Sequence, residues 1–309
     1  MATLLDYRRR IRSVKSTQQI TRAMKFVAAA KLRRSQEGVF AARPYAREIQ
    51  RVLRSAAARM ESATHPLLER RPEEKILLVV VTGDRSLCGA FNSNVIRRAT
   101  LFLRQNAAKK PVALPIGKKG RSSLKRGGWT FAAEYVNVSG NVNFAIAKEI
   151  SGKIAELYSS REVDAVYAAY NEFKNVLVQR LRLEKLLPLD PSVLTDERLG
   201  SFRTDTERHE EALPHDRSAG RSGVDYIYEE PVSEIFKALV PRYLDSEVYR
   251  ILLESSAAEW AARMTAMDAA TRNASELIDK LTLEMNKIRQ AGITKELIEI
   301  VSGAASAMS

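Results

Sequence analysis

The last part of the chain predicts a helix that no compact domain could contain. From Arg242 to Ser309 there is no proline, and the only glycines are Gly292 and Gly303. A continuous helix of about 60 residues, at 1.5 Å per residue, extends for about 90 Å. A compact domain built from the whole chain would be only about 50 Å across. The predicted helix must therefore extend out of any globular core.

The apolar residues of this segment alternate four and three positions apart, which is the spacing of a coiled-coil seam. They are Trp260, Met264, Met267, Thr271, Ala274, Ile278, Leu281, Met285 and Ile288. A seam with this period supercoils against a second helix. We therefore expect another helix along it.

The beginning of the chain predicts that second helix. Thr3 and Asp6 form a capping-box-like start, and neither proline nor glycine occurs before Gly38. The expected apolar stripe, with one change of phase, consists of Leu4, Tyr7, Ile11, Val14, Ile20, Met24 and Val27. Helices at both ends of a chain fold most simply into a long antiparallel coiled coil.

The sequence between these helices alternates between strand and helix patterns. Strands are expected at 75–82, 111–116, 129–138, 163–170 and 176–186, and helices at 92–105, 118–125 and 142–158. This alternation predicts a central α/β domain with a largely parallel sheet and an antiparallel edge. The expected organisation is an N-terminal coiled-coil helix (1–60), the central α/β domain (72–190), a flexible loop (191–224), and a foot segment with the long C-terminal coiled-coil helix (225–309).

The formal net charge of +13 is concentrated near the N-terminus. Between Arg8 and Arg34 there are ten lysines and arginines and no Asp or Glu. Such a segment favours an acidic partner, either nucleic acid, anionic lipid or an acidic protein surface, although a solvated helix face has the same composition. Aromatic residues are scarce there, so base stacking is poorly served.

Membrane insertion and disulfide bonding are both disfavoured. No run approaches 18 apolar residues, and the chain reaches Arg8 before a signal-peptide core could form, so a soluble or peripheral protein is expected. The Arg-rich start also fits a mitochondrial presequence, but it carries part of the helical seam. Cys88 is the single cysteine, which excludes an intrachain disulfide and fits a reducing cytoplasm. Its apolar neighbours favour a core or interface position over a nucleophile.

No catalytic, cofactor or metal site is predicted. The segment GDRSLCGAFN follows a strand and precedes a helix, but Gly89 lacks the Lys and Ser/Thr of a Walker motif and the spacing of a dinucleotide fingerprint. His209 and His215 lie near carboxylates without regular ligand spacing, which favours a solvated loop. Three classes stay open at this point: an enzyme, a basic coiled-coil protein that binds nucleic acid, and a mechanical or scaffold protein. Only the last explains a long helix at each end.

Several segments resemble the gamma-chain family of rotary ATP synthases. They are IRSVKSTQQITRAMKFVAAAKLRRSQ (11–36), ARPYA (42–46), TGDRSLCGAFN (82–92), DYIYEEP (225–231) and the ending at 263–307, which includes ITKELIEIVSGA (293–304). The resemblance covers nearly the whole chain in order. It implies a non-catalytic central rotor shaft that couples proton-driven rotation of the membrane ring to conformational cycling of three catalytic beta subunits.

The resemblance also implies partners and contact residues. The partners would be the alpha and beta subunits of the catalytic ring, the epsilon subunit and the membrane c-ring, without nucleic acid or a small-molecule substrate. The implied location is the cytoplasmic side of the bacterial plasma membrane, as a peripheral subunit. The implied contacts are Met24 and Lys25 with the beta-subunit lever, Arg289, Gln290, Thr294 and Glu296 with the beta-subunit catch, and Tyr226, Tyr228 and Glu229 with the ring.

Overall fold

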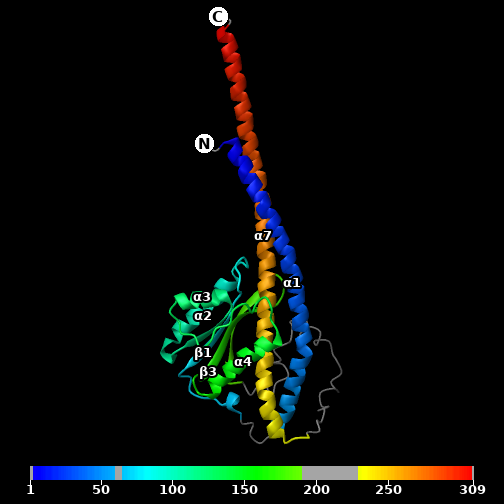
Figure 1. Cartoon of the computed structure of the whole chain (residues 1–309), viewed down its shortest axis with the longest axis vertical. Coiled ribbons are helices and arrows are strands. Elements are labelled where there is room, and N and C mark those ends of the chain that lie inside the picture. The colour runs from blue at the N-terminus through cyan, green and yellow to red at the C-terminus, as the bar shows by residue number, and fades with distance from the viewer. Residues whose placement is uncertain (1–2, 60–64, 190–228, 308–309) are drawn as a thin grey trace, which may run out of the picture. The chain divides into compact units, whose positions relative to one another are not determined.

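The structure is a computed structural model that describes residues 3–59, 65–189 and 229–307. The chain divides into two compact units, one made of Met1–Ala29 with Arg263–Ser309 and the other of Ala30–Ala262. Two long helices contribute to both units: α1 (Leu4–Ala58) and α7 (Val232–Ala307) (Figure 1). The long helices predicted at both ends of the sequence are therefore confirmed.

Both helices are longer than their proline-free stretches. Helix α1 begins with the expected cap, in which the Thr3 backbone N–H donates to Asp6 Oδ2 at 2.9 Å and the Asp6 N–H donates to Thr3 Oγ1 at 3.3 Å. It continues through Pro44, and α7 contains Pro241 near its start. The 76 residues of α7 extend for roughly 110 Å at 1.5 Å per residue.

In the first unit, α1 and α7 form an antiparallel pair. Gln18 Nε2 donates to Ser275 Oγ at 2.6 Å, and Lys25 Nζ lies 2.5 Å from Asp268 Oδ1, so rising numbers in α1 meet falling numbers in α7. The predicted α7 seam is confirmed at its centre, where the buried residues lie seven positions apart. They are Met267, Ala274 and Leu281.

The predicted change of phase in the α1 stripe is wrong. Ile20 and Val27 are 57% and 55% exposed. The seam instead keeps its four-and-three spacing after Val14, through Gln18 and Thr21. The prediction followed apolar residues, but the middle of this seam is polar. There Gln18 pairs with Ser275 and Thr21 pairs with Thr271 across the two helices.

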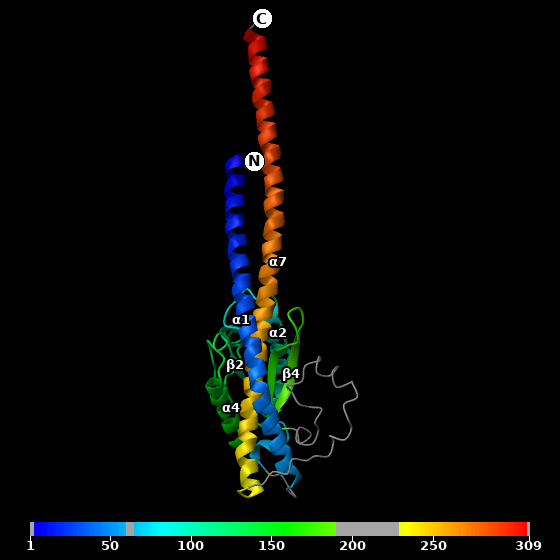
Figure 2. The same ribbon diagram turned by 90° about the vertical axis from the view of Figure 1, so that its right-hand side faces the viewer.

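The second unit continues the antiparallel pairing at close range. An added Cβ at Gly38 of α1 would lie 3.3 Å from Leu253 Cδ2 of α7. Ser35 and Ser256 place their hydroxyl oxygens 3.3 Å apart. Figure 2 shows the two helices beside each other along this unit.

The second unit also contains the α/β domain. Its strands are β1 (Ile76–Val81), β2 (Val112–Ile116), β3 (Ala165–Phe173) and β4 (Gln179–Leu187). Its other helices are α2 (Phe91–Gln105), α3 (Lys118–Arg126), α4 (Phe144–Ser159) and the short 3₁₀ turns η1 (Pro66–Leu68) and η2 (Ala107–Lys109). The sheet order is β2-β1-β3-β4, with parallel pairs except for the antiparallel β3–β4 hairpin. The largely parallel sheet with an antiparallel edge is thus confirmed.

Helices cover both faces of this sheet. Helix α4 and the adjoining parts of α1 and α7 pack on one face, where Ile154, Leu53 and Leu252 join Leu77 in one buried cluster. Helices α2 and α3 cover the other face. Every residue of β1 is buried, as expected for a central parallel strand.

The strand expected at 129–138 is not formed. This segment contacts the outer edge of β2 only through isolated bridges, at Ala113 with Phe131 and at Ile116 with Tyr135. The carbonyl of Pro115 faces this segment and accepts from the Tyr135 N–H at 3.0 Å. The Pro115 nitrogen faces the same side but has no hydrogen to donate, so a regular ladder cannot continue there.

Candidate functional site

The α/β domain has the topology that creates a ligand crevice. In an open parallel sheet, ligands bind beyond the carboxyl ends of the strands at the point where the strand order reverses. Here that point lies between β1 and β3, because the chain passes from β1 to β2 on one side and returns to β3 on the other. The turn after β1 is the GDRSLCGAFN segment that a nucleotide motif would occupy.

Helix α7 occupies this crevice. A Cβ added at Gly83 would lie 2.8 Å from the carboxylate of Glu259, which is itself buried. Ala258 of α7 packs with Cys88 and Phe91, and Phe173 from the end of β3 adjoins them. A cavity beside this contact, lined by Thr82, Ile116 and Glu259 among others, measures about 10 Å³, the size of one water molecule. The crevice therefore holds the long helix rather than a ligand.

The Cys88 prediction is confirmed, since this side chain is 2% exposed inside that contact. Asn92 supports the turn: its Oδ1 accepts from the Gly83 N–H at 2.8 Å, and its Nδ2 donates to Cys88 Sγ at 3.1 Å. The turn is thus built to fit α7.

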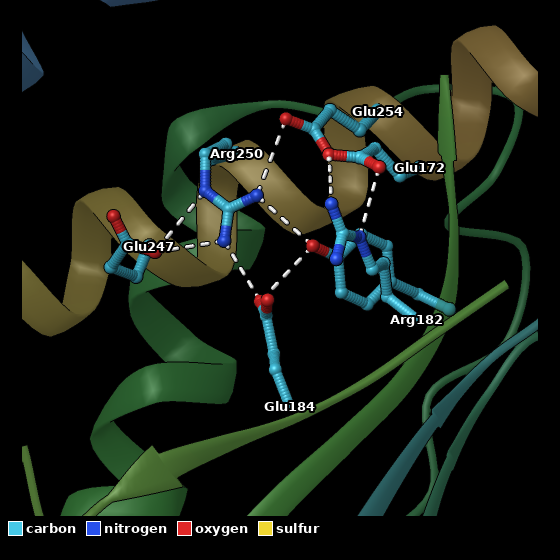
Figure 3. Close-up of polar contacts among 7 residues, drawn as sticks. Glu172, Arg182, Glu184, Glu247, Arg250 and Glu254 are labelled. Atoms are coloured by element: carbon cyan, nitrogen blue, oxygen red, sulfur yellow. Dashed lines mark hydrogen bonds and ion pairs between the residues drawn. The ribbon is translucent and has the colours of Figure 1, made fainter. Parts of the chain in front are cut away.

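A second contact between α7 and the sheet is a buried cluster of charged residues around Arg250 (Figure 3). The Arg250 side chain is 4% exposed. Its Nη2 donates to Glu184 Oε1 of β4 at 2.8 Å, and its Nη1 donates to the hydroxyl of Tyr170 of β3 at 3.0 Å. Along α7, its guanidinium also donates to Glu247 at 2.9 and 3.1 Å and to Glu254 at 3.2 Å. We call Arg250 with these four partners the Arg250 cluster.

The Arg250 cluster joins one turn of α7 to the outer hairpin of the sheet. Burial raises the pKa of the Tyr170 hydroxyl, so it stays protonated and donates to Glu184 Oε1 at 3.0 Å. A neighbouring pair, Arg182 and Glu172, bridges the two hairpin strands at 2.9 Å and is more exposed. Rotating α7 against the hairpin would break the bonds of Arg250 to Glu184 and Tyr170 together, so these two bonds oppose movement of α7 against the sheet.

In the first unit, the expected contact residues Met24 and Lys25 are both half-buried. Lys25 is already paired with Asp268, whose pKa is lowered by the hydrogen bond from Lys25. Asp268 also forms an ion pair with Arg272, whose Nη1 lies 3.2 Å from Asp268 Oδ2. Met24 therefore lies next to the Lys25–Asp268 ion pair, which joins α1 to α7. Its neighbours Ala23 and Phe26 are exposed.

The other expected contact residues lie apart from these. Arg289, Gln290, Thr294 and Glu296 are all exposed on the last turns of α7. The same turns expose large apolar side chains, each more than half accessible: Ile293, Leu297, Ile298, Ile300 and Val301. An apolar surface of this kind is typical of an interface.

The expected foot contacts are only partly described. Glu229 is exposed just before α7. Tyr226 and Tyr228, the 191–224 loop and the histidines His209 and His215 lie outside the described residues.

Two negative findings hold for the described residues. Within 3–59, 65–189 and 229–307, no group of three or more His, Cys, Asp or Glu side chains could hold a metal ion. Within the same ranges, no helix is long and apolar enough to cross a bilayer.

Sequence reasoning missed the Arg250 cluster. Glu247, Arg250 and Glu254 are spaced three and four apart on α7 within a mostly apolar run, which was the available signal. Glu184 and Tyr170 could not be added without knowing which strands this turn of α7 meets.

Comparison with known proteins assigns the family. The family model described as ATP synthase matches residues 3–307. The chain is 47% identical to the ATP synthase gamma chain of Solibacter usitatus, over 99% of this chain and 100% of that one. It is 44% identical to the ATP synthase gamma chain of Pelotomaculum thermopropionicum, over 99% of both chains.

Solved structures agree with this assignment. A chain from the central stalk and c-ring of the Tetrahymena thermophila mitochondrial ATP synthase is 29% identical, with a TM-score of 0.57 over 81% of this chain and 99% of that one. A chain of the Euglena gracilis mitochondrial ATP synthase shares the fold at 20% identity, with a TM-score of 0.62 over 99% of this chain and 94% of that one. The chain therefore belongs to the ATP synthase gamma chain family, the central-stalk rotor subunits of that enzyme.

Proposed function

We propose that this chain is the non-catalytic rotor shaft of a bacterial F-type ATP synthase. It couples proton-driven rotation of the membrane c-ring to conformational cycling of the three catalytic beta subunits, and it also contacts the alpha and epsilon subunits. Its place is peripheral, on the cytoplasmic side of the plasma membrane. Neither nucleic acid nor a small-molecule substrate takes part.

The observation that carries this proposal is the use of the ligand crevice. Helix α7 places Glu259 and Ala258 where an α/β domain of this topology would bind a nucleotide. Catalysis by this domain would require a site that its own helix fills. A domain that holds a long helix in this way suits the transmission of force.

The surfaces of the helical pair suit rotation against other subunits. The ten basic residues of 8–34 lie on α1 with no acidic residue among them, and all except Lys25 are exposed. They favour acidic levers on the beta subunits. The exposed apolar end of α7 suits an apolar sleeve, with Arg289, Gln290, Thr294 and Glu296 as polar contacts to the beta-subunit catch. Tyr226, Tyr228 and Glu229 contact the ring in this proposal.

The substitution Met24→Lys tests the shaft role. Because Lys25 already engages Asp268, a second ammonium beside it has to find its carboxylate on a surrounding subunit. An ion pair formed in only one rotational state, and partly buried there, stabilises that state by about 1 to 3 kcal/mol. Each 1.4 kcal/mol lengthens the dwell in that state by about tenfold.

The measurement compares ATP hydrolysis with ATP-driven acidification in the same membrane vesicles. Met24→Lys is expected to leave hydrolysis largely intact and to lower the ratio of pumping to hydrolysis. The matched control is Ala23→Lys, which adds the same charge at an exposed neighbouring position and should keep the ratio. An unchanged ratio in Met24→Lys would show that Met24 is only a packing residue.

A further inference from the structure

The carboxyl group of Glu254 has an unusual environment within the Arg250 cluster. Its side chain is 12% exposed. One oxygen, Oε1, accepts from Arg250 Nη1 at 3.2 Å. The other, Oε2, is buried and has no hydrogen-bond partner among the described residues. A buried carboxylate oxygen without a partner is costly, whereas a protonated carboxyl group carries no net charge into the interior.

The charges around Glu254 do not balance. Two guanidinium groups, Arg250 and Arg182, face the carboxyl groups of Glu172, Glu184, Glu247 and Glu254 (Figure 3). Tyr170 from β3 is neutral and donates its proton to Glu184. Where α1 meets this turn of α7, it packs uncharged residues, Gly38 against Leu253 and Ser35 against Ser256. Among the described residues in these contacts, four carboxylates face two cations, an excess of negative charge that a proton can reduce.

We propose that Glu254 is a proton-binding site inside the rotor subunit, and that the proton bound there strengthens the hold of the β3–β4 hairpin on α7. The site deepens the proposed function, since it lies in a contact that opposes movement of α7 against the sheet. Its ligand is a proton taken from the surrounding solvent.

The pKa of Glu254 supports this assignment. Burial raises it to about 7 from an ordinary value near 4.5, with the nearby charges of Glu172 and Glu184 acting in the same direction and Arg250 opposing them. When the contact opens, the carboxyl group meets water and returns to its ordinary pKa. Between pH 4.5 and 7 the closed form therefore holds a proton that the open form releases, so raising the pH favours opening. Above pH 7 Glu254 is ionised in both the closed and the open form, so a further rise in pH no longer favours opening.

The test measures hydrogen exchange in the full chain within its assembled complex. Protection factors, corrected for the intrinsic pH dependence of exchange, are compared at pH 6 and pH 8 for the amides of 247–257 and of β4. With closed and open pKa values near 7 and 4.5, linkage predicts about tenfold less protection at pH 8 than at pH 6. Glu254→Gln, which is neutral at both pH values, should show no such change.

Two further variants keep the test decisive even if Glu254→Gln folds poorly. Glu172→Gln removes a charge that raises the pKa of Glu254, so the loss of protection between pH 6 and 8 should shrink. Glu149→Gln, at an exposed position on α4, should keep the full tenfold change. Equal protection at both pH values in the unsubstituted chain, or an undiminished change in Glu254→Gln, would overturn the proposal. The Met24→Lys result does not bear on these outcomes, so the two proposals can fail separately.

Discussion

Replacing Arg250 by Met should weaken the contact between α7 and the sheet more than any exposed substitution nearby. The guanidinium makes five hydrogen bonds to four side chains and is almost fully buried. Methionine is of comparable length but leaves Glu184 and Glu247 without their shared cation. Removing one partner of a buried ionic group costs about 3 to 5 kcal/mol, most of it from the charges left behind.

That cost corresponds to a loss of about two to four decades in amide protection for the α7 turn around Arg250 and for β4, because each 1.36 kcal/mol is tenfold. Hydrogen exchange within the assembled complex measures it. The matched control is Arg182→Met in the same region, where the arginine side chain is 46% exposed and pairs with Glu172. An exposed pair contributes under about 1 kcal/mol, so this variant should lose less than about one decade.

A rescue separates unpaired charge from lost packing. Adding Glu184→Gln and Glu247→Gln to Arg250→Met removes two of the three carboxylates that lose Arg250, the third being Glu254, and should restore part of the protection. Equal losses in Arg250→Met and Arg182→Met would refute the argument from burial. A triple variant no better than Arg250→Met would show that shape, rather than charge, holds this contact.

Three other outcomes are expected. Thr21 and Thr271 share a 2.9 Å contact, while each hydroxyl also lies within hydrogen-bond distance of a carbonyl of its own helix. Because two protons cannot serve three contacts, replacing both threonines by Val should change the free energy of unfolding by less than about 1 kcal/mol; a clearly larger loss in the double variant would contradict this. Truncation after Gly303 should leave substantial rotation, whereas truncation before Arg289 should reduce torque and assembly sharply, and equal activity of the two would argue against the shaft role. The hydrogen bond from Lys185 lowers the pKa of Glu73 to about 2. The stabilisation of the fold by ionised Glu73 should therefore be complete above pH 4.5 and decline as the pH falls towards 2. Acid-unfolding curves measure this decline, and Glu73→Gln should make it shallower.

The elements that were correctly predicted are those whose pattern is set locally. The run Ile76–Val81 is apolar at every position because both faces of its strand are buried, and the α7 seam repeats over several turns. The errors arose where a residue far away in the sequence determines which side chains are buried. Ile20 is exposed because Ser275 and Thr271 on the partner helix favour polar seam residues at 18 and 21.

The candidate site was predictable only in part, for the same reason. The sequence places Met24 beside Lys25 but does not reveal that Asp268, 243 positions later, pairs with Lys25. Glu184 lies 66 residues before its partner Arg250. The partner contacts proposed for Arg289 to Glu296 involve other subunits, so neither the sequence pattern nor the isolated chain determines them.

The crevice filled by α7 bears on how this subunit could be inhibited. A compound designed for the ends of β1 and β3 would compete with Glu259 and Ala258, which are attached to the same chain. Tethered groups act at effective concentrations of the order of millimolar or above. A competitor would therefore need an affinity far better than that for an empty pocket, and its binding would displace the helix. Such a compound would act by uncoupling the shaft from its domain, and its potency would report how strongly the two are held together.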